Sequence, residues 1–205
     1  MVTHDGMLTP AECLAKTDEE LVELTLENQD YFLYLMQRYE KKLLRYVNRT
    51  FSTRQEDAED IVQESFINAY RYLNNFDQKL KFSSWLYRIT HNAAVSNFRK
   101  AKARPQVISS EDNEEILNKI ASGHDLLEEI NDTLTAEQVH DVLGHLDPKY
   151  REVLVLRYLE DREYQEISDI LKKPIGTVGT LLNRAKKQFV RQVKITSAHV
   201  GESYE

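Results

Sequence analysis

The sequence predicts an all-α protein: two small helical domains joined by an acidic linker, the second of them a helix-turn-helix domain. Apolar residues recur every three or four positions along most of the 205 residues, which is the period of an amphipathic helix. Only 6 glycines and 4 prolines are present, too few for the many turns of a β sandwich or barrel. The expected divisions are an N-terminal tail (1–16), a first helical domain (17–104), the linker (105–130), a second helical domain (131–195) and a C-terminal tail (196–205).

The first domain is expected to hold four helices. Hydroxyl-bearing residues predict three of the helix starts: Thr17 with Glu20, Thr53 with Glu56, and Ser83 or Ser84. The second helix should bury Phe32, Leu35, Met36, Tyr39, Leu43, Tyr46 and Val47, and the third Ala58, Ile61, Val62, Phe66, Ala69, Tyr70 and Leu73. After a polar break at 74–81, the fourth should bury Trp85, Leu86, Ile89 and Ala93.

The second domain carries the pattern of a helix-turn-helix. Asp147 followed by Pro148 predicts a helix start, with Asp at the N-cap and Pro at the first helical position. A short helix at 164–171, a bend at 172–174 and a last helix to about Lys194 match the motif, although the bend uses Pro174 rather than the more usual glycine. The last helix should bury Val178, Leu182, Ala185, Phe189 and Val193.

The charge of the chain is strongly segregated. The formal net charge of −7 argues, taken alone, against a nucleic-acid binder. However, residues 61–104 carry 8 basic and 2 acidic side chains, and residues 172–194 carry 7 basic and none acidic. Residues 105–140, which include the linker, carry 9 acidic side chains and 1 basic side chain. A polyanion responds to the local charge of a surface rather than to the net charge of the protein. The two basic blocks are therefore either solvated helix faces or surfaces that attract a polyanion.

Several classes of protein are excluded by what the sequence lacks. Cys13 is the one cysteine, so no internal disulfide and no cysteine-rich metal site is expected. No phosphate loop, nucleophile elbow or metal-binding histidine motif is present. We therefore expect no enzyme activity, no metal and no cofactor. No apolar stretch reaches the length of about 18–20 residues that spans a bilayer, and the N-terminus lacks the pattern of a signal peptide. We expect a cytoplasmic protein without membrane insertion.

The last helix has the residue types of a DNA recognition helix. Small polar residues near its start would reach base edges, and basic residues further along would meet phosphates. The first group is Gly176, Thr177, Gly179, Thr180 and Asn183, and the second is Arg184, Lys186, Lys187 and Arg191. The alternative is an ordinary basic helix whose cations complement the helix dipole.

The block 75–104 mixes aromatic and basic residues. Such a mixture suits single-stranded DNA, because rings stack on unpaired bases while cations follow the phosphates. The residues are Phe76, Phe82, Trp85, Tyr87 and Phe98 with Lys79, Lys81, Arg88, Arg99 and Lys100. Phe82 and Trp85 are more simply explained as core. Phe76, which lies in the polar break, is harder to explain as core.

The third predicted helix begins with an acidic cluster. Acidic groups on its first turns complement the helix dipole, but Asp60, Gln63 and Glu64 extend past the first turn on a shared exposed face. This face predicts a docking surface for a basic partner.

These features in this order resemble the sigma-70 family of bacterial transcription initiation factors, in the compact form of its extracytoplasmic-function (ECF) group. The resemblance covers most of residues 17–194. The residues that carry it are DAEDIVQESFINAY (57–70), FSSWLYRITHNAAVSNFRK (82–100) and LDPKYREVLVLRYLEDREYQEISDILKKPIGTVGTLLNRAKKQF (146–189).

The resemblance implies a sigma factor that binds core RNA polymerase through the clamp helices and flap, recognises promoter DNA and stabilises the melted strand. It implies that core polymerase contacts Asp57, Asp60, Gln63 and Glu64. It implies that the −10 element contacts Phe76, Lys79, Lys81, Trp85, Arg88, Asn92 and Arg99, with Asn92 reading the melted strand. It implies that the −35 element contacts Thr177, Gly179, Thr180, Asn183, Arg184 and Lys187. The resemblance also implies that the acidic linker corresponds to the segment that runs toward the polymerase active centre. It further implies regulation by an anti-sigma factor, which is common in this group.

One departure concerns the −35 reader. After the Gly-Thr-Val motif the family commonly has a basic residue, then Ser, then Arg, whereas this chain has Gly179, Thr180 and Leu181. Two common contacts to phosphate or base are therefore missing, and the preference for the −35 sequence is expected to differ.

Two rival functions stay open. A stand-alone helix-turn-helix regulator would bind its operator as a dimer through a self-complementary interface, and it leaves residues 57–64 and 76–92 unexplained. An adaptor that docks on polymerase without reading promoters is supported only by the departures at Gly179 and Leu181.

Overall fold

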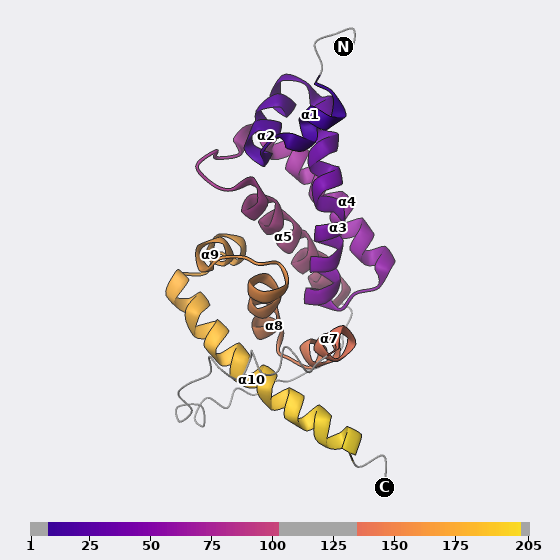
Figure 1. Cartoon of the computed structure of the whole chain (residues 1–205), viewed down its shortest axis with the longest axis vertical. Helices are drawn as coiled ribbons and strands as arrows, with labels where there is room; N and C mark the ends of the chain where they lie inside the picture. The colour runs from indigo at the N-terminus through magenta and orange to yellow at the C-terminus, as the bar shows by residue number, and fades with distance from the viewer. Residues whose placement is uncertain (1–7, 103–134, 202–205) are drawn as a thin grey trace.

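The computed structural model describes residues 8–102 and 135–201, and within these ranges the chain is helical without strands, which confirms the all-α prediction. Figure 1 shows two lobes in contact. The first lobe (8–102) contains α1 (Pro10–Ala15), α2 (Asp18–Glu27), η1 (Gln29–Tyr31), α3 (Phe32–Phe51), α4 (Gln55–Tyr72), η2 (Leu73–Asn75) and α5 (Phe82–Lys102). The second lobe (135–201) contains α7 (Ala136–Gly144), α8 (Pro148–Leu154), the π-helical turn η4 (Val155–Leu159), α9 (Tyr164–Leu171) and α10 (Ile175–Gly201). The predicted linker at 105–130 lies outside the described residues.

The core of the first lobe forms where α3, α4 and α5 pack together. Leu35, Leu43 and Val47 of α3 are fully buried, as the helical spacing predicted. Aromatic rings join α3 to α5: Tyr46 lies 5.1 Å from Tyr87 between ring centroids. Rings that meet at such tilted angles add attraction beyond the apolar area that they bury.

Two members of the predicted stripes are not buried. Met36 of α3 is 37% exposed and Tyr70 of α4 is 43% exposed. The prediction was wrong at both positions. Helix α5 packs against α3 and α4 from one side, but no further helix of the described chain covers the groove between them on the other side. Their side chains instead line an open groove.

Part of the predicted N-terminal tail is helical. Residues 10–15, which were expected in a tail, form α1, capped by a reciprocal pair of hydrogen bonds between Thr9 and Glu12. The predicted capping box of Thr17 and Glu20 is confirmed at the start of α2. By contrast, α4 begins after Arg54 rather than at Thr53, and Arg54 makes no side-chain cap. Acidic residues in the first turn of α4 complement its dipole instead.

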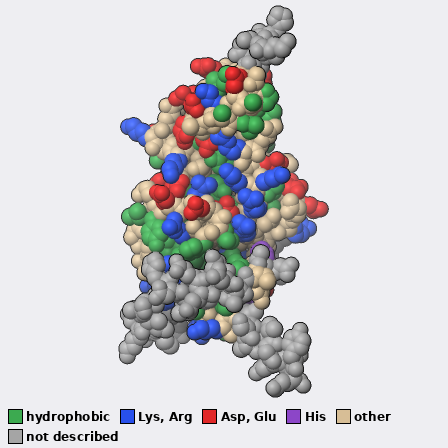
Figure 2. Space-filling model, in the orientation of Figure 1, with side chains coloured by type: hydrophobic (Ala, Val, Ile, Leu, Met, Phe, Trp, Pro, Cys, Tyr) green, Lys and Arg blue, Asp and Glu red, His purple; other side chains and the backbone are tan. Residues whose placement is uncertain are grey.

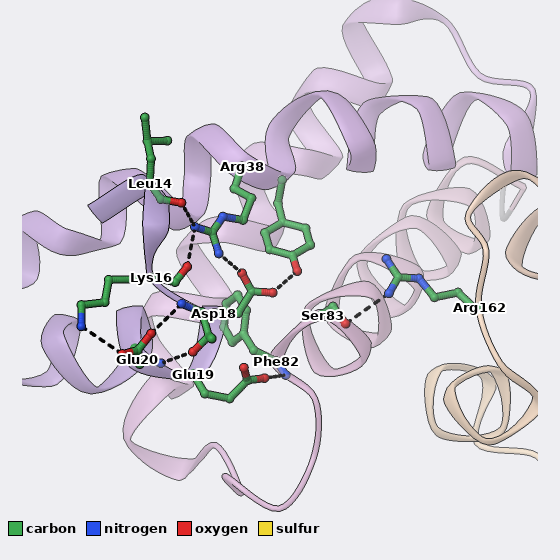
Figure 3. A network of polar contacts seen from close by, with 11 residues as sticks. Leu14, Lys16, Asp18, Glu19, Glu20, Arg38, Phe82, Ser83 and Arg162 are labelled. Atoms are coloured by element: carbon green, nitrogen blue, oxygen red, sulfur yellow. Dashed lines mark hydrogen bonds and ion pairs between the residues drawn. The ribbon is translucent and has the colours of Figure 1, made fainter. Parts of the chain in front are cut away.

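A polar network fastens α1 and α2 to α3 (Figure 3). The guanidinium of Arg38 donates to the Asp18 carboxylate at 2.5 Å and to the carbonyl oxygen of Lys16 at 2.9 Å. The same carboxylate accepts the hydroxyl hydrogen of Tyr39. Charge-assisted bonds of this kind are the stronger ones, so the first two helices are held in a fixed position on the lobe.

The start of α5 is capped from another helix. The expected serine cap is wrong, because α5 begins at Phe82, ahead of both serines. The backbone N–H of Phe82 donates to the Glu19 carboxylate of α2 at 3.1 Å (Figure 3), which satisfies one of the unpaired donors at a helix start. Ser83 and Ser84 are left to bond with the second lobe.

The second lobe forms the predicted helix-turn-helix. Asp147 caps α8 by accepting the backbone N–H of Lys149, and Pro148 is the first helical residue, as predicted. The bend between α9 and α10 is made by Lys172 in the left-handed conformation, with φ of 54°. This lysine takes the place of the glycine that usually ends such a helix. The helix α10 extends to Gly201, beyond the predicted end near Lys194, and it buries the predicted set from Val178 to Val193.

We predict that the core of the first lobe depends on Leu43. Leu43→Ala would leave a cavity at a fully buried site and should lower the free energy of unfolding by about 2–5 kcal/mol, as measured by urea denaturation. The control is Leu33→Ala on the same helix, where the side chain is 52% exposed and the change should be small. Equal effects of the two substitutions would contradict this packing.

Candidate functional site

The acidic cluster of α4 forms a surface open to solvent. Asp60, Gln63 and Glu64 are exposed, and Asp57 is half-buried. Their spacing of three and four residues places them on one side of the helix. Arg54, which the sequence reading did not single out, donates to Asp57 at 2.9 Å, and this bond holds the pKa of the Asp57 carboxyl below its usual value. Three polar side chains therefore remain presented together on α4.

An apolar groove of about 620 Å³ lies beside this surface, between α3 and α4. Its lining includes the apolar side chains of Leu33, Met36, Phe66 and Ile67, together with Gln63 and charged residues. Leu33 and Ile67 are each 52% exposed. The helical periodicity could not reveal the groove, because an apolar residue facing a partner has the same spacing as one facing the core.

The aromatic part of the predicted −10 surface is folded into the core. Phe76 and Trp85 are each 8% exposed. The ring of Phe76 lies 5.2 Å from that of Trp85 and 5.8 Å from that of Phe82, between centroids. The view that Phe76 is hard to explain as core is therefore wrong: although the surrounding turn is polar, its ring is enclosed by the first turn of α5.

The basic and amide side chains of the same surface are more accessible. Lys79, Lys81, Asn92 and Arg99 are exposed, and Arg88 is half-buried. Lys81 lies 3.5 Å from the Glu166 carboxylate of the second lobe. The structure thus places this set along α5 and the turn before it, with one cation already paired across the two lobes.

Next to Asn92, His91 is held in a largely buried site. Its Nδ1 lies 3.1 Å from the hydroxyl oxygen of Tyr46, and its ring lies 5.8 Å from that of Phe51. Burial, with a smaller contribution from the nearby Lys173, lowers the pKa of His91 to about 4. The imidazole is therefore neutral at pH 7.

The predicted −35 surface is presented at the start of α10. Thr177, Thr180, Asn183 and Arg184 are exposed, and Gly179 and Lys187 are half-buried. A Cβ added at Gly179 would lie 3.8 Å from the Tyr164 ring, an ordinary contact distance. Packing therefore does not require glycine here.

Cation–ring contacts that the sequence did not reveal flank this surface. The guanidinium of Arg157 lies 5.7 Å from the Tyr164 ring, and the ammonium of Lys186 lies 5.6 Å from the Tyr158 ring. Figure 2 shows apolar side chains exposed over α9 and the start of α10, where Tyr164 and Ile175 are 41% and 50% exposed. Because only the folded chain brings these pairs together, their sequence spacing gave no signal.

Within residues 8–102 and 135–201, no helix has the length and apolar character needed to cross a membrane. The same part of the chain brings together no group of three or more His, Cys, Asp or Glu side chains that could hold a metal ion.

A helical lobe with an acidic surface and an apolar groove, joined to a basic helix-turn-helix lobe, defines a class of protein that binds both DNA and a protein partner. Comparison with known proteins identifies the family. Residues 35–104 match Sigma-70 region 2, and residues 136–189 match Sigma-70, region 4. The chain is 32% identical to the ECF RNA polymerase sigma-E factor of Haemophilus influenzae, over 87% of this chain and 96% of that protein. It is also 32% identical to the ECF RNA polymerase sigma factor SigW of Bacillus subtilis, over 82% and 91% of the two chains.

Solved structures share the fold. CnrH, in complex with the cytosolic domain of CnrY, superposes with a TM-score of 0.64 at 24% identity, over 88% of this chain and 99% of that one. The sigma factor RpoE, in complex with the anti-sigma factor NepR from Bartonella quintana, gives a TM-score of 0.60 at 19% identity, over 80% and 97%. The chain belongs to the ECF group of the sigma-70 family, and its function is promoter-specific initiation of transcription by RNA polymerase.

We predict that His91 makes stability depend on pH. The folded pKa of about 4 lies below the usual 6.5, so the unfolded chain binds the proton more readily. The stability that the neutral His91 side chain gives the folded protein is fully present above about pH 6.5. It is lost as the pH falls toward 4. In urea denaturation at pH 7 and pH 4.5, His91→Asn should reduce the loss of stability by about 1–3 kcal/mol relative to the unsubstituted chain.

The matched control is His145→Asn, because the His145 side chain is 64% exposed. This variant should keep the pH dependence of the unsubstituted chain. If His91→Asn kept it as well, His91 would not be held neutral in the folded protein.

Proposed function

We propose that three surfaces divide the work of this sigma factor. The exposed side of α4, together with the groove between α3 and α4, docks on the clamp helices of core RNA polymerase, while the second lobe meets the flap. The basic and amide side chains of α5 contact the melted −10 strand. The start of α10 reads the −35 element, and the protein itself catalyses no reaction.

The observation that carries the docking assignment is the position of Gln63. This residue belongs to the exposed acidic surface and also lines the apolar groove. A groove lined by apolar and charged residues suits an amphipathic helix, whose apolar side would enter the groove while its cations meet Asp60 and Glu64. The surface and the groove therefore act as one docking site.

The −10 assignment is supported by the exposed amide of Asn92 and by the cations along α5. An amide offers both donors and acceptors to the edge of an unpaired base, and cations follow the phosphates. Because Phe76 and Trp85 are core in this conformation, we assign them to shaping the turn that carries Lys79 and Lys81. Their stacking on a base would need this turn to open.

The −35 assignment is supported by exposed polar side chains at the first turns of α10, followed by Arg184 and Lys187. This order fits base contacts near the start of a recognition helix and phosphate contacts beyond it. Gly179 and Leu181 leave this reader with fewer contacts than is common in the family. We therefore propose a −35 preference that depends more on Asn183 and Arg184.

The proposed role as a sigma factor also predicts where the protein works and how it is regulated. The protein works in the cytoplasm, where polymerase and promoter meet. The solved structure of RpoE with an anti-sigma factor prompts the proposal that an anti-sigma factor also restrains this chain. The acidic segment 105–130 would approach the active centre of polymerase, where its charge imitates that of nucleic acid.

We predict that reversing charge on α4 weakens binding to core polymerase. Asp60→Lys with Glu64→Lys would repel a basic partner and should raise the dissociation constant by about tenfold or more, as measured by competition for core polymerase. The control is Glu23→Lys with Glu27→Lys, which makes the same charge change at exposed positions of α2. Equal loss in both variants would show that net charge, rather than this surface, governs docking.

We predict that Asn92→Ala separates promoter opening from polymerase binding. Loss of the amide should reduce formation of the open complex by about tenfold, as expected for one or two lost polar contacts to a base. The dissociation constant for core polymerase should stay within about twofold. The measurements are permanganate reactivity of unpaired thymines and the same competition assay. A variant that lost core binding first would remove the −10 role from Asn92.

A further inference from the structure

The first turns of α10 carry no charge. From Pro174 to Asn183 the sequence has no acidic or basic residue, and the first cation of α10 is Arg184. Arginine and lysine make the commonest specific contact in the major groove, by donating to O6 and N7 of guanine. The family commonly has a basic residue directly after Gly-Thr-Val, where this chain has Gly179. The start of α10 therefore lacks the side chains that usually read guanine.

Thr180 lies at the middle of the exposed side of this helix start. The residues three or four positions before and after it are exposed as well: Gly176, Thr177, Asn183 and Arg184. Residues at this spacing share one side of a helix. Because the first residues of a recognition helix contact base edges, Thr180 is central among the side chains that a base pair in the −35 element would meet.

The hydroxyl of Thr180 is already used within the helix. Its Oγ1 donates to the carbonyl oxygen of Gly176 at 2.9 Å, and a threonine hydroxyl has one hydrogen to donate. The methyl group of the side chain is then the group left to contact DNA. Thymine is the base that presents a methyl group in the major groove, and the methyl of threonine is one of the apolar groups that contact it.

The surroundings of Thr180 on α10 are apolar rather than charged. Ile175 is 50% exposed and Tyr164 is 41% exposed. Ile175 lies one turn before Gly179, and a Cβ added at Gly179 would lie 3.8 Å from the Tyr164 ring. Burying such a surface against a thymine methyl is favourable because both lose contact with water.

The two glycines of this helix start allow a close approach to DNA. A Cβ added at Gly176 would meet nothing within 4 Å, and one added at Gly179 would make only an ordinary contact. Glycine destabilises a helix relative to alanine, and packing requires it at neither position. The absence of Cβ atoms lets the helix backbone come near a ligand, which a side chain as short as that of Thr180 needs in order to reach a base.

Asn183 adds a second uncharged contact. Its side chain is exposed, and an asparagine amide can bind N6 and N7 of adenine with two hydrogen bonds. Three residues of helix rise about 4.5 Å, which is close to the spacing of about 3.4 Å between base pairs. Thr180 and Asn183 can therefore address neighbouring base pairs.

We propose that the start of α10 selects A·T base pairs in the −35 element. The methyl group of Thr180 contacts the C5-methyl of a thymine, the Asn183 amide binds the adenine of a neighbouring pair, and Gly179 permits the close approach. This inference rests on the proposed role of α10 as the −35 reader. It adds to that role the base pairs that the reader prefers and the residues that determine the preference.

The test uses the complex of the full chain with core polymerase. A promoter found by run-off transcription is randomised at its −35 element alone, promoter complexes are isolated on a native gel, and their DNA is sequenced. A·T pairs should be enriched over G·C pairs by about tenfold at two neighbouring positions. Deoxyuridine in place of the selected thymine removes only the methyl group and should reduce complex formation by about threefold.

Two substitutions at Thr180 separate its methyl group from its hydroxyl. Thr180→Val keeps a methyl group and lacks the hydroxyl, so it should keep the preference for thymine and the sensitivity to deoxyuridine. Thr180→Ser keeps the hydroxyl and lacks the methyl group, so it should lose both. Asn183→Ala should lose the preference for adenine at the neighbouring position while the thymine preference remains.

A gain of guanine reading tests the role of Gly179. Gly179→Arg supplies the side chain that is common in the family and should raise the share of guanine at a facing position by about tenfold. The matched control is Gln192→Arg, which adds the same charge to the same helix nine residues after Asn183. This control should keep the preference for A·T pairs.

Enrichment of G·C pairs at the positions that Thr180→Ser or Asn183→Ala alters would overturn the selection of A·T pairs while leaving the −35 role intact. An equal response of Thr180→Val and Thr180→Ser to deoxyuridine would overturn the methyl contact. A library without preference at any position, from which the chain still directs transcription, would remove the −35 role itself. The failure of this inference and the failure of the proposed function therefore give different results.

Discussion

Helix α5 packs against α3 and α4 of the first lobe and against α9 of the second. The arrangement of the two lobes depends on this shared helix. Tyr87 shows it most directly, since this residue is fully buried, its ring packs 5.1 Å from that of Tyr46 in the first lobe, and its hydroxyl donates to Glu160 of the second lobe. The buried apolar residues of the two lobes belong to one cluster, which includes Leu86 of α5 and Ile167 of α9. Polar contacts such as that of Tyr87 with Glu160 add to this packing.

The surfaces that we assign to partners lie outside this shared core: the groove and acidic side of α4, the exposed side of α5 and the start of α10. The groove opens to solvent between α3 and α4, beside the exposed residues Asp60 and Glu64.

The sequence was sufficient for the fold class and for most of each helical lobe. Local signals such as Thr17 with Glu20 or Asp147 with Pro148 work because the cap and its partner are neighbours in the chain. Contacts between distant segments left no such signal: Glu19 at the start of α5, Glu160 against Tyr87. Met36 and Tyr70 were assigned to the core because periodicity shows which side of a helix is apolar, but not whether a core or a partner covers it.

The central claim is that this single chain supplies core polymerase with both docking and promoter recognition. Run-off transcription with core polymerase and genomic fragments tests it most directly. The account predicts discrete transcripts that appear only when the chain is added, each starting downstream of a shared pair of −35 and −10 sequences. Binding to core polymerase without any new transcript would contradict the account and would favour an adaptor that has lost promoter reading.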